Sequence, residues 1–442
     1  MSAAQGLRQS LIQGKLSQRY NTIEAAHSST LEWISHQDSI LRKWFDDDTK
    51  LFWINGKPGS GKSTIMKHIY AHKHKFNSKN DRADIYAHFF FSHRGSNLQK
   101  SLEGLLYCLL YQILNQSDDL ADIVLRFVEP VSQEETRRWT IDELEGTFFH
   151  LLQQHHDRFR FWLFLDALDE FEGDPEKVVR FIERCVVETE SSRVALKLCF
   201  ASRPWNVFNT HFTTTARLQV EDHTAADIRK YVVSRTNSHP TTSLMLQSSD
   251  KEEQTALISL QEEVITQAKG VFLWVRLVLD DLLSSLMEGS STEELRVVLA
   301  QLPDGLEELY VALVERIKSG FLREGYIMLE IVLRNQGILP VQKFWDAERS
   351  AFCRPGAIGN YKCRRKGSPS IHPNRVRARI RSRCGGLIEL IGSGQELAVQ
   401  LMHQTTKEFL LRPDTMRLFL PPEDPLSLMD GPPSSLSIIL LY

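Results

Sequence analysis

Residues 56–63 read Gly56-Lys57-Pro58-Gly59-Ser60-Gly61-Lys62-Ser63. The run matches a phosphate-binding pattern, GxxxxGK followed by Ser or Thr, at every fixed position. The apolar residues 51–55 before it predict a strand, and the apolar spacing within residues 65–69 after it predicts a helix. A phosphate-binding loop of this pattern lies between a strand and a helix, which is the order predicted here. The stretch therefore predicts an α/β fold with a phosphate site at the start of a helix.

Each part of this loop has a physical task. Glycines let the backbone wrap, so that successive N–H groups and the helix N-terminus point at phosphate oxygens. We expect Lys62 to reach the β- and γ-phosphates and Ser63 to hold Mg²⁺. The predicted nucleotide-contacting residues of the loop are Gly56, Lys57, Pro58, Gly59, Ser60, Gly61, Lys62, Ser63 and Thr64.

Polar side chains also follow two later strands. Residues 161–165 are continuously apolar, as in a strand covered on both faces, and the run ends at Asp166. An acidic cluster alone predicts only a solvated turn, but its pairing with a phosphate loop predicts a metal site. We expect Asp166 to bind Mg²⁺ through its water shell, and Asp169 or Glu170 to orient or deprotonate the attacking water. Arg203 follows another apolar run and is predicted to touch the γ-phosphate.

Strand and helix patterns alternate over residues 50–222. Further strands are expected at 85–91, 194–200 and 218–220, and a capping box at Thr140 predicts the start of a helix. Such alternation predicts a doubly wound, mostly parallel sheet with its ligand site at the carboxyl ends of the strands. All three polar clusters lie at such ends.

The rest of the chain follows other patterns. After residue 222 the apolar spacing is helical, which predicts a core of helix packed on helix. Residues 353–384 contain ten Arg or Lys and no Asp or Glu, and we expect a loop or a poorly ordered insert there. A helix capped by Thr405 and Glu408 is expected next. Five prolines among the thirteen residues from Pro421 predict a tail.

Composition excludes several classes of protein. The chain has 442 residues, 42% of them hydrophobic and 25% charged, which is too long for one core and typical of folded domains. A formal net charge of −3 gives no overall attraction to nucleic acid or anionic lipid. The apolar runs are too short to span a bilayer, and residues 1–15 lack a continuous apolar segment, so a cytoplasmic protein is expected. The six cysteines form no CxxC pair, which favours free thiols.

The nucleotide is predicted to be ATP. Proteins specific for GTP normally combine an Asp-x-x-Gly switch with an Asn-Lys-x-Asp type motif late in the sheet. The segment Asp166-Ala-Leu-Asp169 lacks that glycine, and Ser78-Lys79-Asn80-Asp81 precedes the second strand, where it is badly placed to touch a base.

The acidic segment also carries a family resemblance. Asp166-Ala-Leu-Asp169-Glu170 resembles the NACHT class of STAND nucleotide-binding switches, and most of all the fungal NOD-like receptor set with nephrocystin-like domains. The similarity covers roughly residues 20–412. Other segments similar to that set, in the same order, are 26–34, 200–205, 270–275, 384–387 and 403–409.

The resemblance implies a molecular switch that acts in fungal innate immunity and heterokaryon incompatibility. ADP would hold the domains closed, and exchange for ATP would open them for homo-oligomerisation. His403 would correspond to the winged-helix histidine that contacts the β-phosphate of ADP; alternatively, it only precedes a helix cap. The implied division is a helical lead-in (1–49), a nucleotide-binding domain (50–222), a helical domain (223–320), a winged-helix-like region (321–412, with a basic insert at 353–383) and a tail (413–442).

Two other functions remain open at this point. A nucleic-acid-binding ATPase could use the basic run 354–383, although Tyr361 is its only aromatic residue and a solvated loop is the simpler interpretation. A scaffold could bind the nucleotide without hydrolysing it. The residues identify no activating ligand, effector or sensor, and no effector domain or repeat array is evident.

Overall fold

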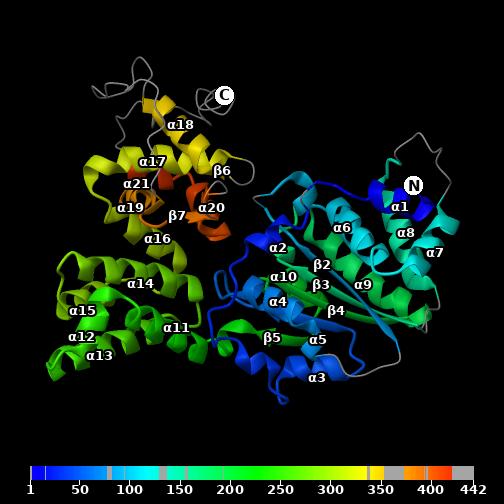
Figure 1. Cartoon of the computed structure of the whole chain (residues 1–442), viewed down its shortest axis with the longest axis horizontal. Helices are drawn as coiled ribbons and strands as arrows, with labels where there is room; N and C mark the ends of the chain where they lie inside the picture. Colours follow the sequence, from blue (N-terminus) through cyan, green and yellow to red (C-terminus); the bar gives the residue numbers. More distant parts are fainter. Residues whose placement is uncertain are drawn as a thin grey trace. The chain divides into compact units, whose positions relative to one another are not determined.

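The chain divides into two compact units in the computed structural model. The first contains Met1–Ser243 and Lys269–Val275, and the second contains Leu244–Ala268 and Arg276–Tyr442. The structure describes residues 2–14, 16–76, 82–93, 95–128, 137–154, 158–192, 194–335, 339–352, 373–392, 394 and 397–420 (Figure 1). The five-part division predicted from the sequence stays a prediction.

A parallel sheet forms the centre of the first unit and confirms the predicted α/β fold class. Its five strands lie in the order β2-β3-β4-β1-β5, and every neighbouring pair is parallel. The strands are β1 (Leu51–Asn55), β2 (Ala83–Phe90), β3 (Phe159–Asp166), β4 (Ala195–Ser202) and β5 (Ala216–Gln219). Since β1 and β3 both flank β4, the segments that follow these three strands meet at one edge of the sheet.

Helices cover both faces of this sheet, which explains its continuous apolar strands. Along β3, Phe161, Leu163 and Leu165 belong to one hydrophobic core, whereas Trp162 and Phe164 belong to another. The alternation follows from the period of two along a strand. The helices of the first unit are α1 (Ala3–Ser10), α2 (Gln18–Thr22), α3 (Ile40–Asp46), α4 (Lys62–Ala71), α5 (Lys73–Phe76), α6 (Leu102–Leu114), α7 (Asp118–Phe127), α8 (Ile141–Gln153), α9 (Pro175–Ser192), α10 (Asn206–His211) and α11 (Ala225–Asn237).

The predicted capping box at Thr140 is confirmed. The Thr140 hydroxyl accepts the backbone N–H of Glu143, while the Glu143 carboxylate accepts the N–H of Thr140 at 2.8 Å. These bonds satisfy two backbone donors that would otherwise lack partners at the start of α8. The helix therefore begins where the sequence pattern indicates.

The second unit is mainly helical and carries a small antiparallel sheet of order β6-β8-β7. Helix α12 (Pro240–Gln247) runs from the first unit into the second, as does α14 (Phe272–Met287), whose first four residues belong to the first. The other elements of the second unit are α13 (Lys251–Gln267), α15 (Thr292–Ala300), α16 (Leu306–Glu315), α17 (Ser319–Arg334), β6 (Leu339–Pro340), α18 (Val341–Phe352), α19 (Pro373–Cys384), β7 (Ile388–Ile391), β8 (Ala398–Leu401), α20 (Gln404–Leu410) and α21 (Thr415–Phe419).

Two local predictions for this unit are wrong. Residues 373–384 form helix α19 instead of a loop, because Val376, Ile380 and Cys384 recur at helical spacing and are buried. The cap of α20 is His403, whose side chain accepts the N–H of Thr405, instead of a box built on Thr405 itself. Residues 353–372, the tail 421–442 and the segment 78–81 lie outside the described residues.

Two absences apply to the described part of the chain. No helix there combines the length and apolar character needed to cross a bilayer. The four described cysteines are free and buried: Cys108, Cys185, Cys199 and Cys384. Their environment agrees with the expectation of free thiols in hydrophobic cores.

Candidate functional site

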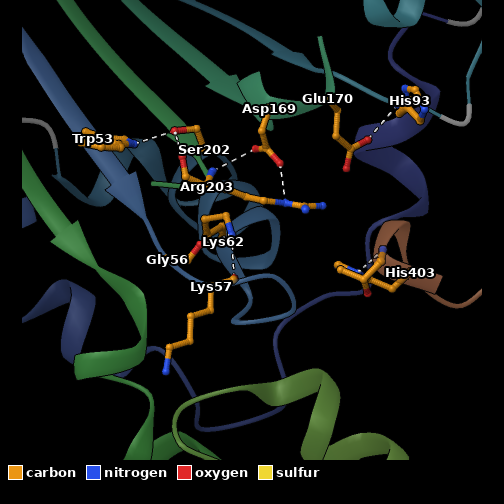
Figure 2. A network of polar contacts seen from close by, with 11 residues as sticks. Trp53, Gly56, Lys57, Lys62, His93, Asp169, Glu170, Ser202, Arg203 and His403 are labelled. Atoms are coloured by element: carbon orange, nitrogen blue, oxygen red, sulfur yellow. Dashed lines mark hydrogen bonds and ion pairs between the residues drawn. The ribbon is translucent and has the colours of Figure 1, made fainter. Parts of the chain in front are cut away.

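The candidate site lies at the carboxyl ends of β1, β3 and β4. Asn55, the last residue of β1, is in register with Ser202 of β4, and Phe90 of β2 is in register with Asp166 of β3. The phosphate loop therefore leaves β1 beside the strand end that precedes Arg203. Figure 2 shows Lys62, Asp169, Glu170 and Arg203 gathered at this edge.

Two glycines of the loop are required by its geometry. Gly61 has a φ of +102° and precedes the first residue of α4, a conformation that L side chains rarely adopt. A Cβ on Gly56 would lie 2.5 Å from a Glu221 carboxylate oxygen and 2.9 Å from the Ser60 hydroxyl. Larger residues at these positions would reshape the turn, so the loop geometry depends on both.

Lys62 holds the loop together through its ammonium group. Its Nζ donates to the carbonyl oxygen of Gly56 at 2.8 Å and to that of Lys57 at 2.9 Å. Desolvation lowers the pKa of Lys62, and the Asp169 and Asp166 carboxylates oppose this while Arg203 adds to it. The structure thus brings Lys62 together with three other residues predicted for the site.

Asp166 is a fully buried carboxylate at the end of β3, with an exposed fraction of 0%. Neither of its oxygens has a protein partner within hydrogen-bonding distance. Burial raises the pKa of Asp166 to about 7, while the nearby Ser63 hydroxyl and Arg19 guanidinium lower it. Burying an ionised carboxylate without a partner costs free energy, which favours a bound ligand as the partner of Asp166.

Ser63 and Asp166 fit a magnesium ion. Mg²⁺ in phosphate-transfer sites keeps several waters and takes only one or two protein oxygens besides the phosphates. A hydroxyl beside an unpaired carboxylate at the start of a phosphate loop supplies this donor set. Among the described residues, no cluster of three or more His, Cys, Asp or Glu could hold a metal by itself. The ion would therefore depend on a phosphate ligand.

The other acidic residues of the segment have partners of different kinds. Asp169 accepts the backbone N–H of Arg203 at 3.1 Å and pairs with its Nε at 2.9 Å. Glu170 accepts the backbone N–H of His93 at 2.9 Å. Asp169 is thus occupied in holding Arg203, whereas Glu170 is oriented by a neutral donor. Of the two predicted water-orienting residues, Glu170 is the one without a cationic partner among the ion pairs of the described chain.

Ala167 sets the direction of these carboxylates. It is one of few residues other than glycine with a positive φ, at +58°, and it turns the chain from β3 into the short 3-10 helix Leu168–Glu170. A left-handed conformation costs about 1 to 2 kcal/mol for a residue with a Cβ. Such strain concentrates at functional sites, where the surrounding structure holds it in place.

Sequence reasoning missed two contacts that fix the phosphate loop. The Glu221 carboxylate, just after β5, accepts the backbone N–H of Lys57 at 3.2 Å. The backbone N–H of Leu273 donates to the carbonyl of Gly59 at 3.1 Å. A Cβ on Gly270 would lie 2.6 Å from Cβ of Glu221, so glycine allows this close approach. The position of Glu221 just after an edge strand was the signal that the sequence offered for the first contact. Nothing in the sequence indicated the Leu273 contact.

His403 belongs to the second unit, so its predicted contact with a nucleotide stays a prediction. Its Nδ1 accepts the backbone N–H of Thr405 at 3.2 Å. Because Nδ1 is an acceptor, the ring carries its proton on Nε2. The Thr405 hydroxyl lies 2.9 Å from Nδ1 and 2.6 Å from the Tyr310 hydroxyl. This network fixes the ring at the start of α20.

A parallel sheet that carries this loop after β1 and an aspartate at the end of β3 defines a P-loop NTPase. Residues 29–203 match the family described as Nephrocystin 3, N-terminal. The chain is also 26% identical over 312 residues to vegetative incompatibility protein HET-E-1 of Podospora anserina. That match covers 67% of this chain and 21% of the relative, about a fifth of its length. These two matches support a NACHT-type P-loop NTPase similar to the fungal NOD-like set.

Solved structures resemble the chain only weakly. Drosophila ORC bound to DNA matches with a TM-score of 0.35 and 12% identity, over 86% of this chain and 94% of that one. Cdc6p from Pyrobaculum aerophilum matches with a TM-score of 0.34 and 12% identity, over 93% and 97%. At these scores the likeness has no bearing on the function of this chain.

Proposed function

We propose that the chain is an ATP/ADP-binding signalling switch that hydrolyses ATP slowly with Mg²⁺. The buried, unpartnered carboxylate of Asp166 beside Ser63 carries the proposal. Such a group calls for a cation, and the neighbouring loop supplies the N–H groups and ammonium that bind phosphates. Together these groups match a nucleotide bound with its metal.

The residues of the site have separate tasks in this proposal. Lys62 binds the β- and γ-phosphates, and Ser63 and Asp166 hold the metal. Mg²⁺, when bound, would neutralise charge on the phosphate oxygens. Glu170 orients the attacking water, held in place by the His93 amide. Arg203, fixed by Asp169, faces the charge that develops on the transferred phosphate.

The energetics require several groups to act together. Moving a two-state equilibrium from 1:99 to 99:1 takes about 5.5 kcal/mol of differential binding. One charge-assisted hydrogen bond contributes about 1.5 to 3 kcal/mol. At least two or three contacts must therefore distinguish ATP from ADP, and we propose that they come from a set of four groups: Lys62, the metal, Arg203 and, in the ADP form, His403.

The proposed biological setting is supported by the named relative. HET-E-1 is a vegetative incompatibility protein, which supports a role in fungal incompatibility for this chain, and we extend the proposal to innate immunity. We propose that ATP binding opens the protein for homo-oligomerisation in the cytoplasm and that hydrolysis restores the closed form. Because the chain spans about a fifth of the relative, effector and sensor partners are left open.

The alternative of a nucleic-acid-binding ATPase would use the arginines of the basic run, but two of the five in its described part are engaged within the protein. Arg379 pairs with Glu324 and Glu348, and Arg383 pairs with Glu324 at 3.2 Å. Arginines engaged in internal ion pairs are poor phosphate ligands, so we retain the switch as the proposed function.

The proposal is tested by Lys62→Ala. Binding of ATP and ADP to the full chain is measured by calorimetry with Mg²⁺, and turnover by phosphate release. We expect both affinities to fall at least a hundredfold, because the variant loses the ammonium that binds the phosphates. Lys75→Ala, at an exposed lysine of α5, is the control for a lost positive charge. Unchanged affinity in Lys62→Ala would refute the site, and binding without turnover would favour the non-hydrolysing scaffold.

A further inference from the structure

Helix α2 lies against the strand end that neighbours Asp166. The element packs beside β2 in Figure 1. The ring centroid of Tyr20 lies 4.7 Å from that of His88 and 5.3 Å from that of Phe90. Phe90 is in register with Asp166 across the β2–β3 pair. A segment some forty residues upstream of the phosphate loop is thus anchored at the metal end of the site.

Arg19 precedes the anchoring tyrosine and has no charged partner in the described chain. Its Nε is buried and has no hydrogen-bond acceptor. The next residue, Tyr20, packs on Phe90, whose register partner across the strand pair is Asp166. A permanently charged, fork-shaped donor is held near the metal site with donors to spare.

The other cations of the site are already engaged. Arg203 is fixed by Asp169 through its side chain and its backbone, and the Lys62 ammonium lies over the carbonyls of Gly56 and Lys57. Asp166 marks the place where a metal would meet the terminal phosphate. A second guanidinium, carried by α2, would therefore approach the phosphate that distinguishes ATP from ADP if a nucleotide occupied the loop.

We propose that Arg19 binds the γ-phosphate of ATP and so makes the N-terminal helix α2 a sensor of the third phosphate. This inference rests on the proposed function, because it needs a nucleotide in the loop. With ATP bound, the phosphate fixes Arg19 and with it α2. With ADP bound, Arg19 lacks the third phosphate, and α2 keeps only its contacts within the protein, such as the packing of Tyr20 and the Lys67 bond to the carbonyl of Ile23.

A simpler role for Arg19 makes a different prediction. If its charge only compensated the buried Asp166, its loss would weaken metal binding, and ATP and ADP would suffer alike. A γ-phosphate contact affects ATP and spares ADP. The ratio of the two affinities therefore separates the two roles.

The experiment measures the binding of ADP and of a non-hydrolysable ATP analogue to the full chain with Mg²⁺. For Arg19→Ala we expect the affinity for the analogue to fall roughly ten- to a hundredfold, the range for a lost charge-assisted bond, and that for ADP to change less than twofold. Arg19→Lys keeps the charge but loses the fork and should recover part of the loss. Arg42→Ala removes another arginine upstream of the loop, one paired with Asp46 on the surface, and is the matched control.

Equal losses for both nucleotides, or no loss for either, would overturn the inference while leaving the proposed function intact. A wild-type chain that binds neither nucleotide would refute both the inference and the proposed function. A measurement on the unmodified chain covers the case in which the variants do not fold. Hydrogen exchange across residues 18–22 should be slower with the ATP analogue than with ADP, and equal exchange would contradict a sensor on α2.

Discussion

Two buried carboxylates, one in each unit, have similar surroundings and different partners. Asp166 and Glu348 are 0% and 5% exposed, and burial raises the pKa of each to about 7. Glu348 of α18 receives a hydrogen bond from Arg379 of α19 at 2.5 Å, and Arg379 also binds Glu324 of α17. Asp166 has no protein partner within hydrogen-bonding distance.

The difference separates a binding site from a structural cluster. Burying a charge costs several kcal/mol unless a partner offsets it. Removing one partner of a buried ion pair destabilises a protein by about 3 to 5 kcal/mol. For Glu348 the protein supplies that partner and thereby joins three helices. For Asp166 we infer that a ligand supplies it. Neither burial nor pKa alone distinguishes the two cases.

Asp166→Asn gives the largest expected effect. Without metal and nucleotide, the variant should unfold at a temperature a few degrees higher, because it no longer buries an unpaired charge, an effect worth about 1 to 3 kcal/mol. Turnover with Mg²⁺ should fall about a thousandfold, since the metal loses its protein carboxylate. Calorimetric melting and phosphate release measure the two effects.

Two possible results of the same substitution would contradict this prediction. If Asp166→Asn lowers the melting temperature, or is stabilised by Mg²⁺ and ATP as strongly as the wild type, Asp166 is a structural group like Glu348. Glu293→Gln, at an exposed carboxylate, controls for the loss of one negative charge.

Glu170→Gln and Asp169→Asn test whether the two other carboxylates of the site have different roles. Glu170→Gln should bind ATP like the wild type and hydrolyse it about a hundredfold more slowly, the loss expected for a residue that orients or deprotonates water. Asp169→Asn should instead loosen Arg203, because it weakens the ion pair between them. Single-turnover rates measured beside affinities distinguish the two variants. Equal turnover in Glu170→Gln and the wild type would transfer the role to Asp169 or to another group.

The sequence predicts the surroundings of Asp166 better than those of Glu348. The loop at 56–63 and Asp166 follow apolar strands directly, so local patterns place them at the sheet edge. Glu348, Glu324 and Arg379 come from three helices, and no local spacing announces that they meet. Arg19 was missed for the same reason, because α2 comes to the end of β2 only through the packing of Tyr20 on Phe90.

The helix α19 shows why composition misled. Residues 373–384 carry five arginines and no acid, which favoured a loop. The acids that neutralise two of these arginines lie on α17 and α18, distant in sequence. Helical spacing of Val376, Ile380 and Cys384 was the available signal.

Glu348→Gln gives the smallest effect and tests the structural side of the comparison. Burial raises the pKa of Glu348 from 4.5 to about 7, with Arg379 opposing and Glu324 adding to the rise. The folded state therefore holds a proton that the unfolded chain releases, and stability falls as the pH rises from about 4.5 to 7. The Gln variant cannot titrate, so this part of the fall should disappear.

The measurement is urea unfolding of both chains at pH 5 and at pH 7.5. Of the wild-type decrease between these values, about 2 kcal/mol should be absent in Glu348→Gln, since each pKa unit corresponds to about 1.4 kcal/mol. Nucleotide affinity should not change, because the cluster lies in the second unit and no residue of it belongs to the phosphate site. An identical pH dependence in the two chains would mean that Arg379 keeps Glu348 ionised in the folded state. A changed affinity would instead give the second carboxylate a part in nucleotide binding, and the contrast with Asp166 would no longer hold.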